Sequence, residues 1–326
     1  MLLPETHAAA LAMMLAAMVC WGSWPSARRM APAWPLEYFQ FDYSVGVVLA
    51  ALVAVFTGGM CCGTPDVLED LRAAPGIALG CAGASGVAVG FGNYLLMVGI
   101  ARVGMTVAFP VSVGLALVVS TALSYLVRPL GDPALLAGGV GLVFCAVLSN
   151  SLVYRSAQKE AGGRSRGGLA LCVLAGALYS IAGPLIARAM LPPRPLSGYG
   201  VALLYAFGCA AATAPLVAYA ARRREGQASL SVQDYIRGSK REHAAGLLAG
   251  IVYGIGAVFV LLAAGLAGMA AAGAIGQANP LVAALWGIVV WKEFRGAAPR
   301  TWALVALMLA LYSAGLVLLG FSLRTA

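Results

Sequence analysis

The chain has 326 residues, of which 61% are apolar and only 10% are charged, and its formal net charge is +9. Soluble domains carry about 25% charged residues, so this composition excludes an ordinary water-soluble enzyme. The mean hydropathy of +0.89 indicates a membrane protein with short loops. Apolar segments bounded by charges or by Pro and Gly predict ten membrane-spanning helices. In chain order they cover residues 8–30, 38–60, 75–99, 105–127, 133–154, 168–190, 198–221, 244–265, 269–291 and 301–322.

The basic residues predict the orientation. With ten helices, 16 of the 21 Lys and Arg residues lie on one side of the membrane and five on the other. Cytoplasmic loops carry the excess of basic residues, so we expect a plasma (inner) membrane protein with both termini outside and with loops 5/6 and 7/8 in the cytoplasm. Loop 7/8 is expected to rest on anionic lipid head groups. Basic residues spread over five connections form no continuous groove, so we expect no nucleic-acid partner.

The two halves of the chain resemble each other at matching places. The matches are Trp24-Pro25 with Gly183-Pro184, Gly90-Phe-Gly92 with Gly254-Ile-Gly256, and Phe109-Pro110 with Asn279-Pro280, at offsets of 159, 164 and 170 residues. Because each half has an odd number of helices, the second must be inverted relative to the first, as in many secondary transporters. The sequence therefore predicts an all-α membrane fold with a first five-helix repeat (1–154), a cytoplasmic linker (155–167) and a second five-helix repeat (168–326).

Four prolines are candidate hinges. Pro25 and Pro184 lie at equal depth in their helices but near opposite membrane faces, and each removes a backbone hydrogen bond and favours a kink. They are expected to bend an inner and an outer gate, or simply to bend helices for packing. Pro110 lies in a first helical turn, whereas Pro280 lies deeper, where its freed carbonyl needs a partner or faces a cavity.

Asp42 is the ionisable residue that stands out within the predicted spans. A carboxyl group buried at this depth can take up and release a proton, which makes Asp42 a candidate for proton coupling. The alternative is an interfacial Asp near a helix N-terminus, stabilised by the helix dipole and by Arg28 or Arg29.

Neutral polar and aromatic residues within the spans are candidates for binding a solute. They suit a neutral, hydrogen-bonding molecule, because an ion calls for more charge; contacts between helices and interfacial aromatic belts are the competing roles. Pairs of small residues such as Gly76 and Gly80 predict close helix packing. The solute candidates are Trp21, Trp24, Asn93, Tyr94, Tyr179, Tyr253, Gln277, Asn279 and Trp286.

Enzymatic and metal chemistry has little support. The seven cysteines form no CxxC pair and the chain has only two histidines, so we expect no metal site and no cofactor. No Ser/His/Asp set or carboxylate pair lies at membrane depth, so no enzyme is predicted.

Several motifs resemble those of the plant ureide permeases and related bacterial proteins. They are Cys20-Trp-Gly-Ser-Trp-Pro25, Asp42-Tyr43 and the segments 92–104, 111–125, 276–287 and 292–294. The bacterial glucose/rhamnose porters are the neighbouring group, and both lie within the drug/metabolite transporter superfamily. The resemblance implies ten helices in two inverted repeats around a central cavity, and proton-coupled uptake of ureides, nucleobase-like compounds or sugars. The plant proteins carry a phosphate-loop-like stretch in their longer central loop, which is missing here.

The hypothesis is a secondary active transporter that takes up a small neutral polar solute, a ureide or nucleobase-like compound, with protons. A sugar porter of the glucose/rhamnose type and a drug/metabolite exporter are the alternatives. A proton or sodium gradient is the expected driving force, lipids and the solute are the expected partners, and the sequence leaves a monomer or a homodimer open.

Overall fold

The computed structural model describes residues 3–59, 67–103, 105–157, 166–223, 231–290 and 298–323, and all regular elements in them are helical. The first half contains α1 (His7–Ser23), the 3₁₀ helix η1 (Trp24–Met30), α2 (Leu36–Ala54), the π-helix η2 (Val55–Gly59), α3 (Val67–Ala73), α4 (Gly76–Val103), α5 (Met105–Val127) and α6 (Pro133–Ala157). The second half contains α7 (Arg166–Ala189), α8 (Gly198–Arg223), α9 (Val232–Ile236), α10 (Lys240–Gly276), α11 (Pro280–Leu285), the π-helix η3 (Trp286–Val290) and α12 (Pro299–Ser322).

The chain is a multi-pass integral membrane protein. Among the described residues, seven helices are long and apolar enough to cross a membrane, if the 51-residue stretch Lys240–Val290 counts as one. Val111–Val127 and Pro133–Ser149 are shorter apolar helices. Eight of the ten predicted ranges lie within a few residues of observed helices, and the exceptions are 244–265 and 269–291. The sequence did not predict α3 and α9, because five to seven residues in polar loops are too short to show a helical period.

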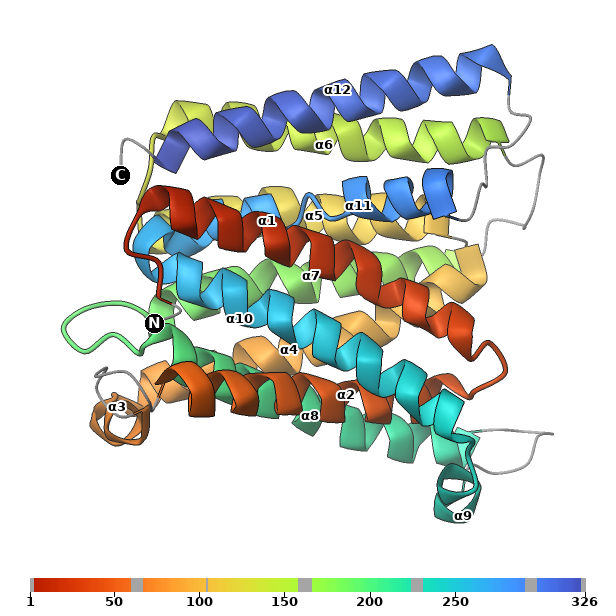
Figure 1. Ribbon diagram of the computed structural model, residues 1–326, viewed down its shortest axis with the longest axis horizontal. Coiled ribbons are helices and arrows are strands. Elements are labelled where there is room, and N and C mark those ends of the chain that lie inside the picture. The colour runs from red at the N-terminus through yellow and green to blue at the C-terminus, as the bar shows by residue number, and fades with distance from the viewer. Residues whose placement is uncertain are drawn as a thin grey trace.

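The helices form one bundle with two distinct edges (Figure 1). Helices α6 and α12 pack together at one edge, and α2 and α8 lie at the other, with α4, α7 and α10 between them. The short helices α3 and α9 lie at opposite ends of the bundle. Helix α1 begins, and α12 ends, at the α3 end.

Helix α10 bends sharply at Gly268 and ends before a second break. Gly268 has φ +76°, a left-handed conformation that glycine adopts without the steric cost of a Cβ. Both predicted helices 244–265 and 269–291 therefore begin within α10. The second is interrupted at residues 277–279, and α11 begins at Pro280, where a missing backbone N–H is tolerated.

Glycines bring helix backbones into contact along the centre of the bundle. A Cβ on Gly250 would lie 1.9 Å from the backbone oxygen of Tyr43, and one on Gly86 would lie 2.0 Å from that of Tyr205. The predicted packing of Gly76 and Gly80 is wrong, because a Cβ at either position would meet no atom within 4 Å. The small-residue spacing alone does not indicate which face of a helix is buried.

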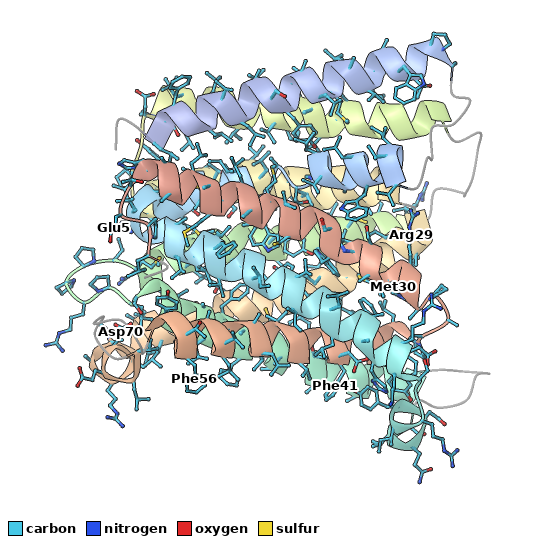
Figure 2. The ribbon with its side chains drawn as sticks, in the orientation of Figure 1. Glu5, Arg29, Met30, Phe41, Phe56 and Asp70 are labelled. Carbon is cyan, nitrogen blue, oxygen red and sulfur yellow. The ribbon has the colours of Figure 1, made fainter. Side chains whose placement is uncertain are left out.

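The outer surface of the bundle is apolar, as expected for lipid contact. Phe41 on α2 and Phe56 on η2 are 45% and 58% exposed and point away from the bundle (Figure 2). The neighbouring residues Tyr43 and Val47 on the same helix are fully buried. Helix α2 therefore has one face toward lipid and one toward α8 and α10.

Candidate functional site

A cavity of about 100 Å³ lies between α1, α4, α5, α7, α8 and α10, next to the break between α10 and α11. A single water needs roughly 10–15 Å³ by this measure, so the cavity has room for several waters or a small solute. Residues from both halves of the chain surround it. Seven of the nine predicted solute-binding residues line it: Trp21, Trp24, Asn93, Tyr179, Tyr253, Gln277 and Asn279.

Aromatic rings form one wall of the cavity. The rings of Trp21 and Tyr253 stack with centroids 5.7 Å apart and planes 20° apart, and Trp24 meets Tyr253 edge-on at 5.9 Å. Trp21 Nε1 donates to the backbone oxygen of Tyr253 at 3.2 Å, and the hydroxyls of Tyr205 and Tyr253 are hydrogen bonded at 2.8 Å. Gly256 leaves room for Trp21, since a Cβ there would lie 2.8 Å from the indole. The wall is fixed in place and offers flat faces to a ring-shaped solute.

Asn93 connects three helices beside this wall. Its side chain is 3% exposed, its Nδ2 donates to the Tyr43 hydroxyl at 2.9 Å, and its Oδ1 accepts from the Tyr179 hydroxyl at 2.7 Å. Gly92 lets the Tyr179 ring approach α4, because a Cβ there would lie 2.6 Å from the ring. Both ends of the Asn93 carboxamide are thus occupied, and Asn93 orients the two tyrosines that it bonds.

The break after α10 contributes two more carboxamides, Gln277 and Asn279, whose oxygens differ from that of Asn93 in having no hydrogen-bond partner. Asn279 is 8% exposed, and its Nδ2 donates to the Gly276 backbone oxygen at 3.3 Å, which fixes which end of the amide faces the backbone. Asn279 Oδ1 and Gln277 Oε1 are buried without a hydrogen-bond partner. Such unsatisfied acceptors cost free energy unless a ligand or water supplies donors. The arrangement favours a solute with N–H or O–H groups.

Two of the predicted solute-binding residues do not line the cavity. Tyr94 follows Asn93 on α4 and is half-buried outside the cavity wall. Trp286 in η3 donates its Nε1 to the Ser23 hydroxyl at 2.8 Å, which ties η3 to the end of α1. Trp286 is thus a contact between segments that flank the cavity.

The four predicted hinge prolines lie at different kinds of position. Pro25 follows the end of α1 in the first turn of η1, and Pro280 begins α11, so each coincides with a change of helix. Pro184 lies inside α7. Pro110 lies in α5, but its side chain is outside the described part of the structure. Their role as gates stays a prediction.

Asp42 is buried, with 4% exposed, but it lies outside the cavity near the α9 end of α2. Its Oδ2 accepts from Trp34 Nε1 at 3.1 Å, and its Oδ1 lies 2.5 Å from the Tyr235 hydroxyl and 3.0 Å from His243 Nδ1. Burial, followed by the contact with Asp42, raises the pKa of Tyr235 in α9, so Tyr235 remains a hydrogen-bond donor at neutral pH.

The partner expected for Asp42 has another function in the structure. Arg28 donates to the backbone oxygens of Ala31 and Trp34, and its guanidinium lies 5.5 Å from the centre of the Phe39 ring. It therefore holds the turn before α2 and indirectly positions Trp34 over Asp42. Asp42 pairs instead with His243 of α10, whose Nδ1 lies 3.0 Å from Asp42 Oδ1.

Sequence reasoning missed several residues of these two groups. Tyr43 and Tyr205 complete the cavity network, and Trp34, Tyr235 and His243 surround Asp42. His243 is 201 residues from Asp42 in the chain, and no local spacing connects them.

Comparisons with known proteins give a consistent result. The family model described as ureide permease matches residues 39–167 and 206–322. The chain is 25% identical to "Ureide permease 4" of Arabidopsis thaliana over 97% of both chains, and 24% identical to "Ureide permease 2" of the same plant over 98% of both. A crystal structure with 14% sequence identity superposes with a TM-score of 0.65 over 96% of both chains, which shows a shared fold.

Proposed function

Because the chain belongs to the ureide permease family, whose members are membrane transporters and not enzymes, we propose that it imports a small neutral ureide or nucleobase-like solute together with protons. The solute binds in the central cavity, and Asp42 carries the coupling proton. The plasma (inner) membrane is the proposed location.

One observation carries the choice of solute. The cavity combines the flat aromatic wall of Trp21 and Tyr253 with the two unpartnered carboxamide oxygens of Gln277 and Asn279. A cyclic ureide has a planar ring for the wall and N–H donors for the two oxygens. It needs no charged partner, and the described residues that line the cavity are all uncharged.

The glucose/rhamnose type of porter remains the second candidate, because a sugar ring also packs on tryptophan and offers hydroxyl donors. A cavity of about 100 Å³ does not suit the drug-sized substrates of a multidrug exporter, which need roughly 300 Å³ or more.

Matching contacts in the two halves support an architecture of ten spans in two inverted repeats, divided as 1–154 and 168–326. Most residues of the linker 155–167 lie outside the described part. Helix α10 packs on α2 as α4 packs on α8, and α10 packs on α1 as α4 packs on α7. The matching contacts are Gly86 on Tyr205 with Gly250 on Tyr43, Gly90 on Ala212 with Gly254 on Ala50, and Gly92 on Tyr179 with Gly256 on Trp21.

The charges at the two ends support an orientation with the α9 end in the cytoplasm. Arg28, Arg29, Arg237, Lys240 and Arg241 belong to elements at the α9 end, and Arg29 is labelled there in Figure 2. Glu5 and Asp70 lie at the α3 end. The positive-inside rule then places both termini outside, and Pro25 near the inner and Pro184 near the outer face as candidate gates.

The test of the solute is a double replacement, Gln277→Met with Asn279→Leu. Removing both acceptors is expected to weaken saturable uptake of labelled hydantoin into proteoliposomes about 100-fold, since each lost hydrogen bond in a buried site costs roughly 1.5 kcal/mol. Gln40→Met is the matched control, because Gln40 is 1% exposed on α2 and lies outside the cavity. Unchanged hydantoin uptake in the double variant would contradict the proposed site, and uptake of glucose in preference to hydantoin would favour the sugar porter.

A further inference from the structure

The cluster around Asp42 joins three elements at one end of the bundle. Trp34 precedes α2, Tyr235 lies on α9, and His243 lies on the first turns of α10. Trp34 Nε1 and the Tyr235 hydroxyl donate to the Asp42 carboxyl group, and His243 Nδ1 lies within hydrogen-bond distance of it. Tyr38 adds a further tie, because its hydroxyl donates to the Ser231 backbone oxygen at 2.7 Å, directly before α9.

The contacts of His243 and Asp42 require a proton in the pair. The His243 Nδ1 lies 3.0 Å from Asp42 Oδ1, and its Nε2 lies 3.0 Å from the backbone oxygen of Tyr235. The backbone oxygen only accepts, so Nε2 must carry a proton for that bond. The second bond then forms either between a protonated Nδ1 and the carboxylate, or between a protonated Asp42 and a bare Nδ1. In both arrangements the complete cluster holds one proton more than a neutral ring beside a carboxylate, and loss of that proton removes one of the two bonds.

At the opposite end of the bundle, the residues that the structure describes include no such pair. There α3 is tied to the start of α8, where the Ser197 backbone N–H donates to Asp70 Oδ2 at 2.9 Å. This donor does not titrate. The matching glycines of α4 and α10 are 164 residues apart, and the matching tyrosines of α2 and α8 are 162 residues apart. By these offsets His243 corresponds to Leu79, and Asp42 corresponds to Leu204. A short helix thus lies at each end of the bundle, but the Asp42–His243 pair lies at the α9 end.

The pair is shielded from the membrane and yet open to water at one edge. Rings of Trp34 and Tyr235 lie edge-on to the His243 ring, with centroids 5.1 Å and 4.7 Å away. The His243 side chain is 29% exposed and that of Asp42 only 6%. A proton can therefore exchange between His243 and solvent without passing through the apolar interior.

We propose that His243 and Asp42 form one proton-binding latch, which holds α9 and the start of α10 on α2 while the pair keeps its proton and loosens this contact when the proton leaves. In the transporter proposed above, on which this inference rests for its role in uptake, the latch lies at the cytoplasmic end. His243 is then a positioning residue for Asp42, and the pair makes closure depend on pH.

Several other charged groups near the latch have partners of their own. Arg28 of η1 bonds the turn before α2 and lies near Glu37 of α2. Asp234 of α9 accepts from the Ser231 hydroxyl, and Glu242 of α10 accepts from Ser239. Arg237 follows α9, and Lys240 and Arg241 begin α10, so basic charge also lies at this end.

Among the described residues, the titratable groups that contact the Asp42 carboxyl are Tyr235 and His243. Burial raises the pKa of Tyr235, which stays a hydrogen-bond donor at neutral pH, so the pH response belongs to the Asp42–His243 pair.

Hydrogen exchange measured by mass spectrometry on the full-length protein tests the latch without any solute. After correction for intrinsic exchange, amides of residues 231–246 are expected to exchange about tenfold faster at pH 8 than at pH 5.5, since loss of the proton from the Asp42–His243 pair removes one charge-assisted bond. His243→Gln keeps one hydrogen bond but cannot titrate, so its exchange is expected to be equal at both pH values. Asp70→Asn, the control at the α3 end, is expected to keep the wild-type pH response of residues 231–246.

Two results would overturn the latch. One is equal exchange at both pH values in the wild type; the other is a wild-type pH response in His243→Gln, which would mean that His243 only fills space. Uptake is read separately: His243→Gln is expected to lose accumulation driven by the proton gradient about tenfold while solute exchange at equal pH persists. If the wild type moves no solute at all, the proposed function fails, while the exchange measurement still decides the latch.

Discussion

Gly250→Ala is expected to lower the free energy of unfolding by about 3 kcal/mol, the upper range for an overpacked core. The added Cβ would lie 1.9 Å from the Tyr43 backbone oxygen and 2.9 Å from the Gly46 Cα. Both are backbone atoms, so no side chain can rotate away and α2 must separate from α10. In detergent, the midpoint of thermal unfolding is expected to fall by roughly 10 °C.

Two further glycines make this prediction specific. Gly80→Ala on α4 is the control, because its Cβ would meet nothing within 4 Å, and the better helix propensity of Ala is expected to leave the protein unchanged or slightly more stable. Gly86→Ala, whose Cβ would lie 2.0 Å from the Tyr205 backbone oxygen, is expected to match Gly250→Ala, because its contact is equally close. A Gly250→Ala variant as stable as Gly80→Ala would contradict the packing of α2 on α10.

These glycines also show the limit of sequence patterns. A spacing of four between small residues predicts contact, yet Gly76 and Gly80 face open space, while Gly86 and Gly250 touch a neighbouring backbone. The helices are apolar on all sides, because lipid and protein neighbours both require apolar residues, so hydrophobicity does not mark the buried face. Helix ends were predictable, since charges, Pro and Gly mark them in the sequence.

In the candidate site, too, some residues could be predicted from the sequence and others could not. Polar residues inside apolar helices are costly, so seven of the nine chosen from the sequence alone lie around the cavity. Their partners were not predictable: Tyr43 and Tyr205 resemble ordinary interfacial tyrosines until their hydroxyl contacts are known. His243 was missed for another reason. It lies in the polar segment before the predicted helix 244–265, and the tertiary fold brings it to Asp42.

Asn93→Leu is expected to have the largest effect on uptake of any single change in the cavity. It leaves the hydroxyl of the fully buried Tyr43 without its donor and the Tyr179 hydroxyl without its acceptor. Each orphaned buried group costs roughly 1–3 kcal/mol, and the freed Tyr179 ring no longer holds its place in the cavity wall. Solute uptake into proteoliposomes is expected to fall about 100-fold, a loss of roughly 2.7 kcal/mol in transport efficiency.

A double-mutant cycle separates this network from simple loss of volume. Adding Tyr43→Phe to Asn93→Leu removes a hydroxyl that the first change leaves unpaired, so the pair is expected to unfold at a higher temperature than Asn93→Leu alone. Ser85→Ala is the control on the same helix, since Ser85 is fully buried but its hydroxyl bonds only the nearby Ala82 backbone oxygen. Additive effects of Asn93→Leu and Tyr43→Phe would mean that their hydrogen bond contributes nothing, and Asn93 would then be a packing residue beside the cavity.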